Sequence, residues 1–347
     1  MVKVDTHNLG AGNPCLLIAE IGINHNGDVQ LAKRMIDAAV SAGADAVKFQ
    51  SFRTEDFIAD RTLTYEYSSK GRRTRESQYD MFKRCELTPE DLLKLRKYAD
   101  RRGVIFFSTP TSESGVAELA RMGVVLLKNG SDFLTHLPLI RAMARSGLPT
   151  ALSTGMATLA EIDEAVRAFR SEGNDQLILF HCTSAYPTPP QEVHLRKIPV
   201  LAAAFRCPVG LSDHTEGITA AIGAVVLGAC CIEKHFTIDK KLPGPDHQFS
   251  ADGDEFAALV EGVRSVEKCL GSPSIEPTPL ELSGRQNYRL SCVAARSLAA
   301  KHKLTEPDLS FHRPGTGHPP AHSRLLVRRV LKRNVEKGHI FDLEDFE

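Results

Sequence analysis

Short apolar runs alternate with longer amphipathic segments along the first 270 residues of the chain. Strand-like runs cover residues 16–20, 45–50, 104–108, 124–128, 149–153, 176–182, 208–212 and 230–235. Helical spacing of apolar residues marks 29–42, 89–102, 112–122, 136–146, 158–171, 216–228 and 254–269. This alternation predicts a (β/α)8 TIM barrel. An open doubly wound sheet is the alternative, but eight regular units without a Gly-rich dinucleotide turn favour the barrel.

Two segments interrupt the alternation. Residues 51–87 form a long polar connection, rich in Arg, Ser and Tyr, which is typical of a lid, a binding loop or a partner contact. Residues 271–284 are rich in Pro and Ser and read as a linker. We therefore expect a catalytic domain over 1–270, a linker over 271–284 and a small domain over 285–347. That domain carries β-like pieces at 292–296 and 325–327, and no internal repeat is evident beyond the strand–helix alternation.

Composition narrows the class of partner. Hydrophobic residues make up 42% and charged residues 25% of the chain, as in ordinary globular domains. Lys+Arg and Asp+Glu both total 43, which argues against nucleic acid or an anionic membrane surface. Neither a signal peptide nor a membrane-length apolar run is recognisable. The eight cysteines contain no C-x-x-C pair, so we expect a reducing, cytoplasmic setting.

Two histidines lie where neighbouring predicted strands end. His214 follows the run 208–212, His235 ends the run 230–235, and a predicted helix separates them. A β-α-β unit brings such strand ends to one rim, so the pair predicts a metal site. Mn²⁺, Co²⁺ or Zn²⁺ suits two imidazoles with carboxylate or water ligands, and Mg²⁺ is less natural. The alternative is two unrelated histidines hydrogen-bonded near strand ends.

Polar residues end the other predicted strands too, where barrel enzymes place their active sites. Lys48 and Lys128 close apolar strands, and Ser and Thr hydroxyls follow neighbouring ones. Together they predict a site for a phosphorylated carboxylic acid such as phosphoenolpyruvate. Structural ion pairs with Glu20 or Glu233 are the alternative for the two lysines. A Schiff-base aldolase would use a barrel lysine but would not need the histidine pair.

Nine motifs in order resemble the sialic acid synthase family, which makes nonulosonic acids from phosphoenolpyruvate and an amino-sugar aldehyde. They lie at 19–27, 47–50, 107–110, 152–156, 181–189, 210–215, 233–237, 243–247 and 313–317, and they span nearly the whole chain. Singly most of these motifs are weak, but together they are specific. The C-terminal piece resembles the family's antifreeze-like (SAF) domain.

The resemblance implies a role for each matching residue. It makes His214 and His235 the ligands of a divalent metal, Mn²⁺ first, that polarises the aldehyde. It makes Glu20 the acidic group near the metal and the aldehyde, and Gln50, Tyr186 and Asp246 the sugar contacts. Glu20 is also our candidate for the base that handles the protons of the water or the aldehyde. Arg313 would reach the active site of the other subunit in a domain-swapped homodimer. The resemblance also implies a set of phosphoenolpyruvate contacts: Lys48, Thr109, Lys128, Ser131, Ser153, Ser184 and Ser212.

Two positions depart from the family pattern. Ser184 stands where the family has Asn, and Phe133 stands where it has a sugar-binding acid. The resemblance implies an N-acyl hexosamine aldehyde such as N-acetylmannosamine as the acceptor. Because Phe133 cannot accept a hydroxyl hydrogen bond, the sharper hypothesis is a substrate that differs from N-acetylmannosamine, such as a deoxy or additionally N-acylated sugar. The alternative is that Phe133 turns into the barrel wall and Asp132 replaces the acid. A metal-dependent aldolase or phosphodiesterase, or a sugar-binding protein led by the small domain, are the rival functions.

Overall fold

The computed structural model describes residues 1–69 and 72–347, which divide into two compact units, Met1–Gly271 and Ser272–Glu347. Helix α10 (Pro279–Tyr288) lies in the second unit and begins inside the predicted linker. The first part of this helix thus lies within the predicted linker 271–284, and none of its residues is buried, so the linker boundaries stay a prediction. Thr278 and Glu281 form a capping box, and Pro279 occupies the first turn, where proline is well tolerated. Pro279, one of the prolines that suggested a linker, thus marks the start of this helix.

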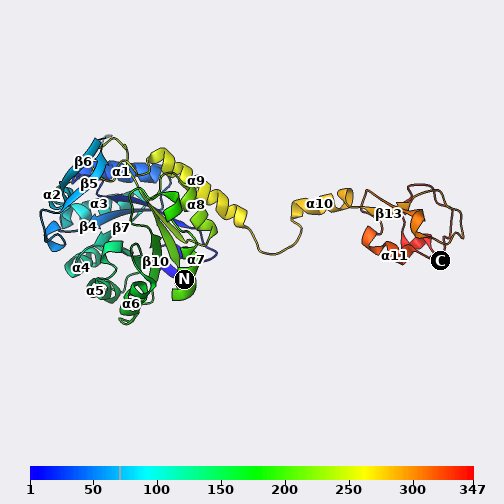
Figure 1. Ribbon diagram of the computed structural model, residues 1–347, viewed down its shortest axis with the longest axis horizontal. Coiled ribbons are helices and arrows are strands. Elements are labelled where there is room, and N and C mark those ends of the chain that lie inside the picture. The colour runs from blue at the N-terminus through cyan, green and yellow to red at the C-terminus, as the bar shows by residue number, and fades with distance from the viewer. Residues whose placement is uncertain (70–71) are drawn as a thin grey trace. The chain divides into compact units, whose positions relative to one another are not determined.

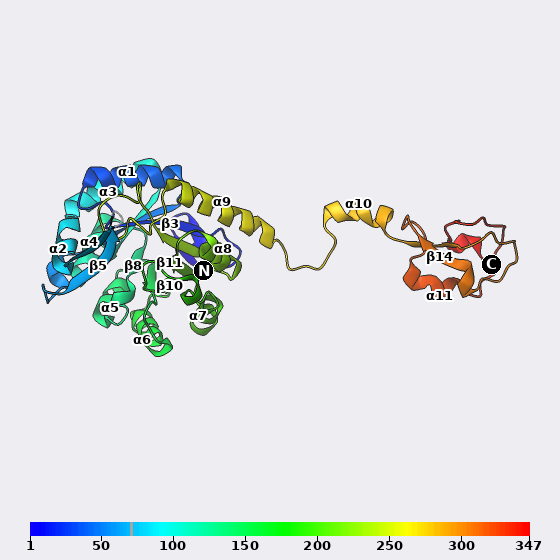
Figure 2. The same cartoon turned by 45° about the horizontal axis from the view of Figure 1, so that its top comes forward.

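Eight parallel strands of the first unit close into a barrel with helices outside it, as the sequence predicts (Figure 1, Figure 2). Each strand pairs with its neighbour in chain order, and β9 pairs with β10 to continue the ring. The barrel strands are β3 (Leu16–Gly22), β4 (Ala46–Ser51), β7 (Ile105–Pro110), β8 (Leu127–Asn129), β9 (Thr150–Ser153), β10 (Leu177–Cys182), β11 (Val209–Asp213) and β12 (Cys231–His235).

The barrel helices follow the predicted positions with one omission and one shortening. They are α1 (Val29–Ser41), α3 (Pro89–Arg102), α4 (Glu113–Met122), α5 (Leu137–Arg145), α6 (Leu159–Arg170), α7 (Lys197–Phe205), α8 (Thr219–Val226) and α9 (Gly253–Leu270). Helix α7 was not predicted because its outer face is itself apolar, so it shows no polar periodicity. The helix predicted over 216–228 is shorter in the structure. No helix among the described residues has the length and apolar character needed to cross a membrane.

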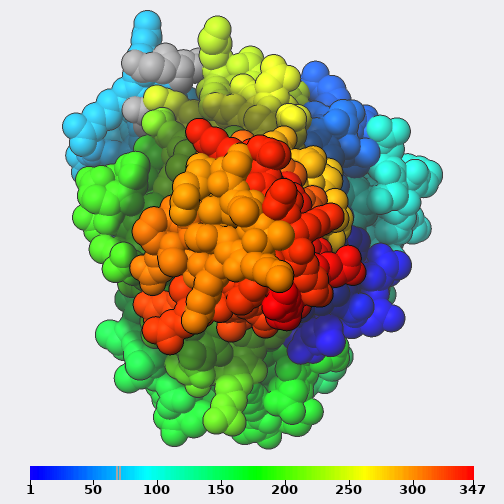
Figure 3. Space-filling view, turned by 90° about the vertical axis from the view of Figure 1, so that its right-hand side faces the viewer, coloured from blue at the N-terminus to red at the C-terminus, as the bar shows by residue number. Residues whose placement is uncertain are grey.

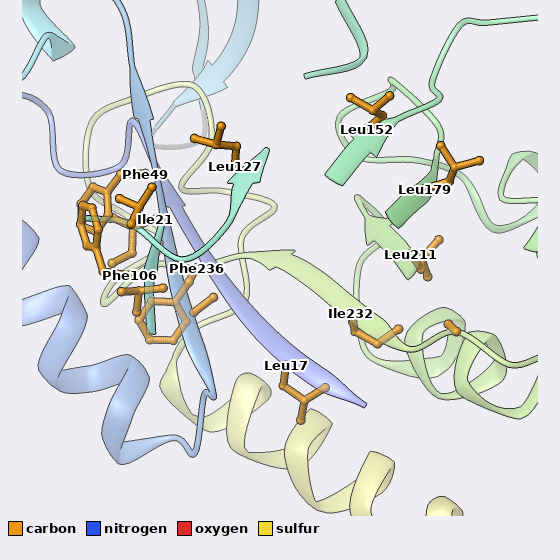
Figure 4. Close-up of a cluster of buried hydrophobic side chains, with 14 of the residues drawn as sticks. Leu17, Ile21, Phe49, Phe106, Leu127, Leu152, Leu179, Leu211, Ile232 and Phe236 are labelled. Atoms are coloured by element: carbon orange, nitrogen blue, oxygen red, sulfur yellow. The ribbon is translucent and has the colours of Figure 1, made fainter. Parts of the chain in front are cut away.

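Side chains of the strands alternate between two apolar layers. Outward residues such as Leu17, Leu152 and Ile232 pack against the helices in one large core (Figure 4). Inward residues such as Ile18 and Ile178 fill the barrel itself. Side chains point to the same face at every second position, so the inward residue two places after Ile18 is Glu20. In this way the polar residues near the strand ends point into the rim of the barrel.

A hairpin that the sequence did not predict closes the opposite end of the barrel. Strands β1 (Val2–Val4) and β2 (His7–Leu9) pair in an antiparallel register. Val2, Val4 and Leu9 join the apolar cluster inside the barrel. Each strand has only three residues, which is too short to give a clear alternation.

The 51–87 connection has regular structure of its own. It contains a short 3₁₀ turn η1 (Thr54–Asp56), strands β5 (Thr64–Ser69) and β6 (Arg72–Ser77), and helix α2 (Gln78–Cys85). The two strands form an antiparallel pair, and Ser77 caps the helix through its hydroxyl. The polar composition that suggested a lid, a binding loop or a partner contact belongs largely to an exposed hairpin, in which Arg73 and Glu66 form a cross-strand ion pair.

The second unit has two halves that repeat one another, which corrects the expectation of no internal repeat. Its elements are α10, β13 (Ser291–Ala294), β14 (Leu309–His312), α11 (Ser323–Leu326) and the 3₁₀ turns η4 (Glu306–Asp308), η5 (Pro320–His322) and η6 (Leu343–Asp345). The β-like piece expected at 325–327 is mostly helical. In the first half, Asp308 accepts hydrogen bonds from Arg296 and His302. In the second, Asp345 does so from Arg333 and His339, each 37 residues later.

The two halves meet along backbone hydrogen bonds. Leu298 and Val335, also 37 residues apart, exchange a mutual pair of N–H···O=C bonds of 2.8 and 2.9 Å. Orange residues of the first half and red residues of the second lie side by side on the face of this unit that Figure 3 shows. The sequence identity between the halves is confined to a few polar positions, which explains why the repeat is hard to see before the hydrogen bonds are known.

Candidate active site

A cavity of about 550 Å³ opens at the carboxyl ends of the barrel strands. It contains every predicted site residue of the first unit, because their side chains project inward from neighbouring strands and the loops that follow them. The cavity-lining members of the predicted set are Glu20, Lys48, Gln50, Thr109, Lys128, Ser131, Ser153, Ser184, Tyr186, Ser212, His214, His235 and Asp246. The structure thus brings them together, whereas their individual roles remain predictions.

Two lysines and two glutamates meet on the cavity floor. Lys48 Nζ lies 3.1 Å from Glu20 and 3.5 Å from Glu233, and Lys128 Nζ lies 3.6 Å from Glu233. The ion pairs that were the alternative for these lysines are therefore present. All four side chains are buried. The two ammonium groups and the two carboxylates make the cluster formally neutral. An added anion would therefore have to share the ammonium groups with Glu20 and Glu233.

Burial and pairing act in opposite directions on these four groups. Burial alone would lower the pKa of Lys48, but Glu20 and Glu233 outweigh it and raise that pKa. Burial opposes ionisation of Glu233, yet Lys128 and Lys48 hold its pKa below the usual range. For Glu20, burial together with the nearby Glu233 raises the pKa despite the opposing Lys48. Desolvation lowers the pKa of Lys128.

Hydroxyl groups surround the lysines. Lys48 donates to Thr109 Oγ1 at 3.2 Å, and Lys128 donates to Ser153 Oγ. Ser212 donates to Glu233 at 3.0 Å. These contacts join the ammonium groups to hydroxyls on β7, β9 and β11. They leave the Ser and Thr oxygens near the cavity floor, as an anion site requires.

Gly155 allows two more hydroxyls to approach the mouth of the cavity. The Gly155 N–H donates to Ser131 Oγ at 3.0 Å. A Cβ at position 155 would lie 2.4 Å from Ser184 Oγ and 2.7 Å from Ser131 Oγ, so any larger residue would displace them. The buried Ser184 hydroxyl has no hydrogen-bond partner among the described residues. It is therefore available to a ligand.

The histidine pair stands on the adjacent strand ends, with ring centroids 5.4 Å apart. His214 Nδ1 lies 2.8 Å from the Thr183 carbonyl oxygen, a contact that orients the ring. The other ring nitrogen, Nε2, lies 3.4 Å from Ser212 Oγ and is the one that could turn to a ligand. His235 Nδ1 is buried without a hydrogen-bond partner in the described chain and lies 3.5 Å from the Asp246 carboxylate. Burial and the nearby His214 hold the pKa of His235 well below its usual range.

Carboxylates complete the surroundings of the pair. Burial and the proximity of Glu20 raise the pKa of Asp246 to about 7. Glu20 and Glu233 each keep one buried carboxylate oxygen without a hydrogen-bond partner in the part of the chain that is described. No group of three or more His, Cys, Asp or Glu side chains among the described residues is close enough to hold a metal ion alone. The protein thus offers two imidazoles with carboxylates nearby.

A buried ion pair behind the histidines was not predicted from the sequence. Lys234, which points away from the cavity, donates to Asp213 at 2.8 Å and to the Thr215 carbonyl at 2.7 Å. Asp213 in turn accepts from the Thr215 N–H at 3.0 Å. These bonds tie β12 to the loop that carries His214. The signal in the sequence is a lysine between Glu233 and His235, at the end of an apolar run.

Comparison with known proteins identifies the family. The NeuB family model matches residues 35–274. The chain is 41% identical over 344 residues to an uncharacterized protein of Methanocaldococcus jannaschii, covering 99% of this chain and 98% of that protein. It is 41% identical over 333 residues to an N,N'-diacetyllegionaminic acid synthase of Legionella pneumophila, and the match covers 95% of this chain and 94% of that protein. A solved N-acetylneuraminic acid synthetase of Leptospira borgpetersenii superposes with a TM-score of 0.74 at 34% identity, and the match covers 82% of this chain and 94% of that one.

The chain belongs to the NeuB family. Since its characterised relatives are acid synthases that align over nearly their whole length, the chain is an enzyme of this type. The resemblance read from its motifs is confirmed at the level of the family.

Phe133, one of the two departures from the NeuB pattern, lies at the cavity together with Asp132. The Phe133 ring packs partly against the apolar core and lies 6.3 Å from the ring of Phe57. Asp132 folds back so that its Oδ1 would lie 2.4 Å from a Cβ on Gly130. The two expectations for this loop were alternatives. In the structure, the phenylalanine and the aspartate both line the cavity.

Arg313 is the one predicted site residue outside this NeuB cavity. It lies in the second unit, where it is exposed and its guanidinium sits 5.3 Å from the centre of the Tyr288 ring. Its predicted role in the site of a second subunit stays a prediction.

Proposed function

We propose that this enzyme joins phosphoenolpyruvate to an N-acyl hexosamine aldehyde and releases phosphate, giving a nonulosonic acid. The observation that carries the proposal is one cavity with two buried lysines and several hydroxyls on its floor and two histidines at its edge. This arrangement offers a phosphorylated acid and a carbonyl separate sites on a single rim. Membership of the NeuB family supports the same reaction type.

The lysines hold the anion in this proposal. Lys48 and Lys128 bind the phosphate and carboxylate groups, with Thr109, Ser131, Ser153, Ser184 and Ser212 as hydroxyl donors. Their contribution is positioning, because neither amine needs to form a covalent bond. C3 of phosphoenolpyruvate forms the new bond to the aldehyde carbon, water adds at C2, and the C2–O bond breaks as phosphate leaves. Glu20, beside Lys48, handles the proton of the water or the aldehyde.

His214 and His235 would hold the divalent metal, Mn²⁺ first and Co²⁺, Zn²⁺ or Mg²⁺ as alternatives. The residues fit such an ion, since His235 Nδ1 is buried without a partner in the described chain and His214 is fixed through its other nitrogen. When bound, the ion supplies Lewis-acid polarisation of the aldehyde oxygen. Asp246 and Tyr186 flank the pair and, with Gln50, would contact the sugar.

For the acceptor, we infer a 6-deoxy, doubly N-acylated hexosamine rather than N-acetylmannosamine. The L. pneumophila relative at 41% identity is named for a diacetylated product, whereas the sialic acid synthetase structure is 34% identical. Phe133 at the cavity also offers no carboxylate to a polar hexosamine. The second unit, an antifreeze-like (SAF) domain in this proposal, lends Arg313 to the partner site in a domain-swapped homodimer. All eight cysteines are free thiols, which fits a cytoplasmic enzyme.

Phosphate release tests the proposed function. The purified enzyme is incubated with phosphoenolpyruvate, one acceptor at a time, and each divalent metal after treatment with a chelator. We expect release that requires both an acceptor and a metal. His214→Ala and His235→Ala should abolish turnover without loss of fold, and full activity in metal-free enzyme would refute the metal site. No release with any hexosamine would favour the aldolase or phosphodiesterase alternative.

A further inference from the structure

Four phenylalanines form one apolar side of the cavity, here called the phenylalanine wall: Phe52, Phe57, Phe82 and Phe133. Ring centroids are 5.7 Å apart for Phe52–Phe57, 5.4 Å for Phe52–Phe82, 5.1 Å for Phe57–Phe82 and 6.3 Å for Phe57–Phe133. Three members come from the 51–87 segment and the fourth from the loop after β8. The wall therefore joins two distant stretches of chain at the cavity.

The wall is not fully covered by protein. Phe52 is buried, but Phe57, Phe82 and Phe133 are only half-buried and face a cavity whose floor is charged. At the mouth, Met156 is 73% exposed and has a left-handed backbone with φ +64°. Apolar side chains left open to a ligand cavity mark the place where an apolar part of the ligand lies.

The wall lies across the rim from the histidine pair. Around the closed barrel, β8 is four strands away from β12 in either direction, so the loop that carries Phe133 faces the strand that carries His235. An acceptor whose aldehyde carbon lies near the histidines would point its remote carbons toward the wall. Gln78 and Thr111 also line this cavity, and the Thr111 hydroxyl has no hydrogen-bond partner among the described residues.

We propose that the phenylalanine wall is a subsite for methyl groups on the remote carbons of the acceptor. It would bind a deoxy C6 methyl and the methyl of a remote acylamino group, while Thr111 or Gln78 meets the amide. Phe57, Phe82 and Phe133 thereby determine specificity. This inference rests on the proposed function, because it assumes that the cavity binds an amino-sugar aldehyde.

Paired substitutions test the wall. Phe57→Asn and Phe82→Asn make it polar, whereas the matched variants Phe57→Leu and Phe82→Leu keep it apolar. Steady-state rates are measured at saturating phosphoenolpyruvate with N-acetylmannosamine and with its 2,4-diacetamido-6-deoxy analogue. We expect each Asn variant to lose about tenfold in kcat/KM for the analogue, mainly through KM, because an apolar contact discriminates by that order. N-acetylmannosamine should lose much less, and the Leu variants should keep the parental preference between the two sugars.

A further variant covers the case in which an Asn variant does not fold, as judged by its thermal melting. Phe133→Glu changes a half-buried side chain and restores an acid, so the preference should move toward N-acetylmannosamine. Equal losses for both acceptors, or an unchanged ratio in folded variants, would show that the wall only packs the 51–87 segment. Absence of phosphate release by the parent enzyme with either acceptor would instead overturn the proposed function.

Discussion

At the scale of single residues, the cavity floor depends on charge balance. Lys48 and Lys128 share Glu233, and Lys48 also pairs with Glu20, all away from bulk water. A buried charge is tolerated only when it is paired, and removing one partner leaves the other uncompensated. Bound phosphoenolpyruvate would compete with the glutamates for the same ammonium groups. The lysines therefore serve both the fold and the proposed anion site.

Replacing either lysine should separate these two contributions. Lys48→Met and Lys128→Met should each raise the KM for phosphoenolpyruvate, since each lost charged hydrogen bond is worth about 1.5–3 kcal/mol. Lys48→Met should also lower the melting temperature more than Lys128→Met, because it leaves two glutamates without their nearer cation. Steady-state kinetics and calorimetry measure the two effects. Parental KM and kcat in a folded variant would make that lysine a structural ion-pair partner alone.

The direction of a side chain on a strand follows from the sequence, whereas its partner on another strand does not. Because side chains alternate in direction along a strand, Lys48 and Glu233 are expected to point into the barrel near the carboxyl ends of their strands. The convergence of these residues was therefore predictable. Lys234 was not, because its partner Asp213 lies on another strand and only the register between β11 and β12 brings them together. The position of Asp132 depends on the backbone of a short turn, which no periodicity specifies.

At the scale of elements, the barrel was predictable because each strand and most helices have a clear period. The elements that were missed have different causes. Helix α7 has an apolar outer face, the β1–β2 hairpin is stabilised only by the barrel interior, and the repeat in the second unit is expressed in a few polar positions. Helix α10 was hidden by prolines that in fact begin it.

The Lys234–Asp213 pair connects two elements that each carry a histidine. Lys234→Met should destabilise the protein by about 3–5 kcal/mol, because it leaves the Asp213 carboxylate buried and unpaired. It should also weaken metal binding, since the loop that carries His214 loses its link to β12. Thermal unfolding and a metal titration measure these outcomes. The double variant Asp213→Leu with Lys234→Met should recover stability but not metal affinity. Recovery of both would contradict a positioning role.

The two carboxylates of the second unit predict how its stability depends on pH. Burial opposes their ionisation, but hydrogen bonds from His302 and Thr305 to Asp308 outweigh it and lower that pKa. Hydrogen bonds from the Asp342 N–H and His339 likewise lower the pKa of Asp345. The ionised forms therefore stabilise the folded unit fully above the unfolded pKa of about 3.9. This contribution is lost as the pH falls through the lower folded values.

We therefore expect the urea midpoint of the second unit to fall as the pH drops below about 4. Hydrogen exchange with mass spectrometry, referenced to unfolded chain at each pH, follows this unit within the whole protein. Asp345→Asn should lower the midpoint at neutral pH and weaken its dependence on acid. A midpoint that does not change between neutral and acidic pH would show that these hydrogen bonds contribute no net stability.

At the scale of the whole molecule, the proposed active site is built from two chains. The cavity of the first unit contains every predicted site residue except Arg313, which belongs to the second unit. In the proposed domain-swapped homodimer, each active site takes its cavity from one chain and its arginine from the other.

Mixed dimers test this arrangement. Arg313→Ala and His235→Ala should each be inactive alone. Dimers that contain one chain of each kind should recover part of the activity, because one of their two sites has both residues intact. Native mass spectrometry verifies that mixed dimers form. If verified mixed dimers remain inactive, Arg313 acts within its own chain or not at all.

The fate of C3 of phosphoenolpyruvate decides whether the enzyme forms the proposed carbon–carbon bond. The enzyme is supplied with [3-¹³C]phosphoenolpyruvate, a divalent metal and the 2,4-diacetamido-6-deoxy acceptor, and the label is followed by carbon NMR. The account predicts that the label moves from the vinyl carbon into the CH₂ group of a 3-deoxy sugar acid, with one phosphate released for each new carbon–carbon bond. Label that remains in phosphoenolpyruvate, or that appears only in pyruvate, with every hexosamine acceptor and metal would contradict it.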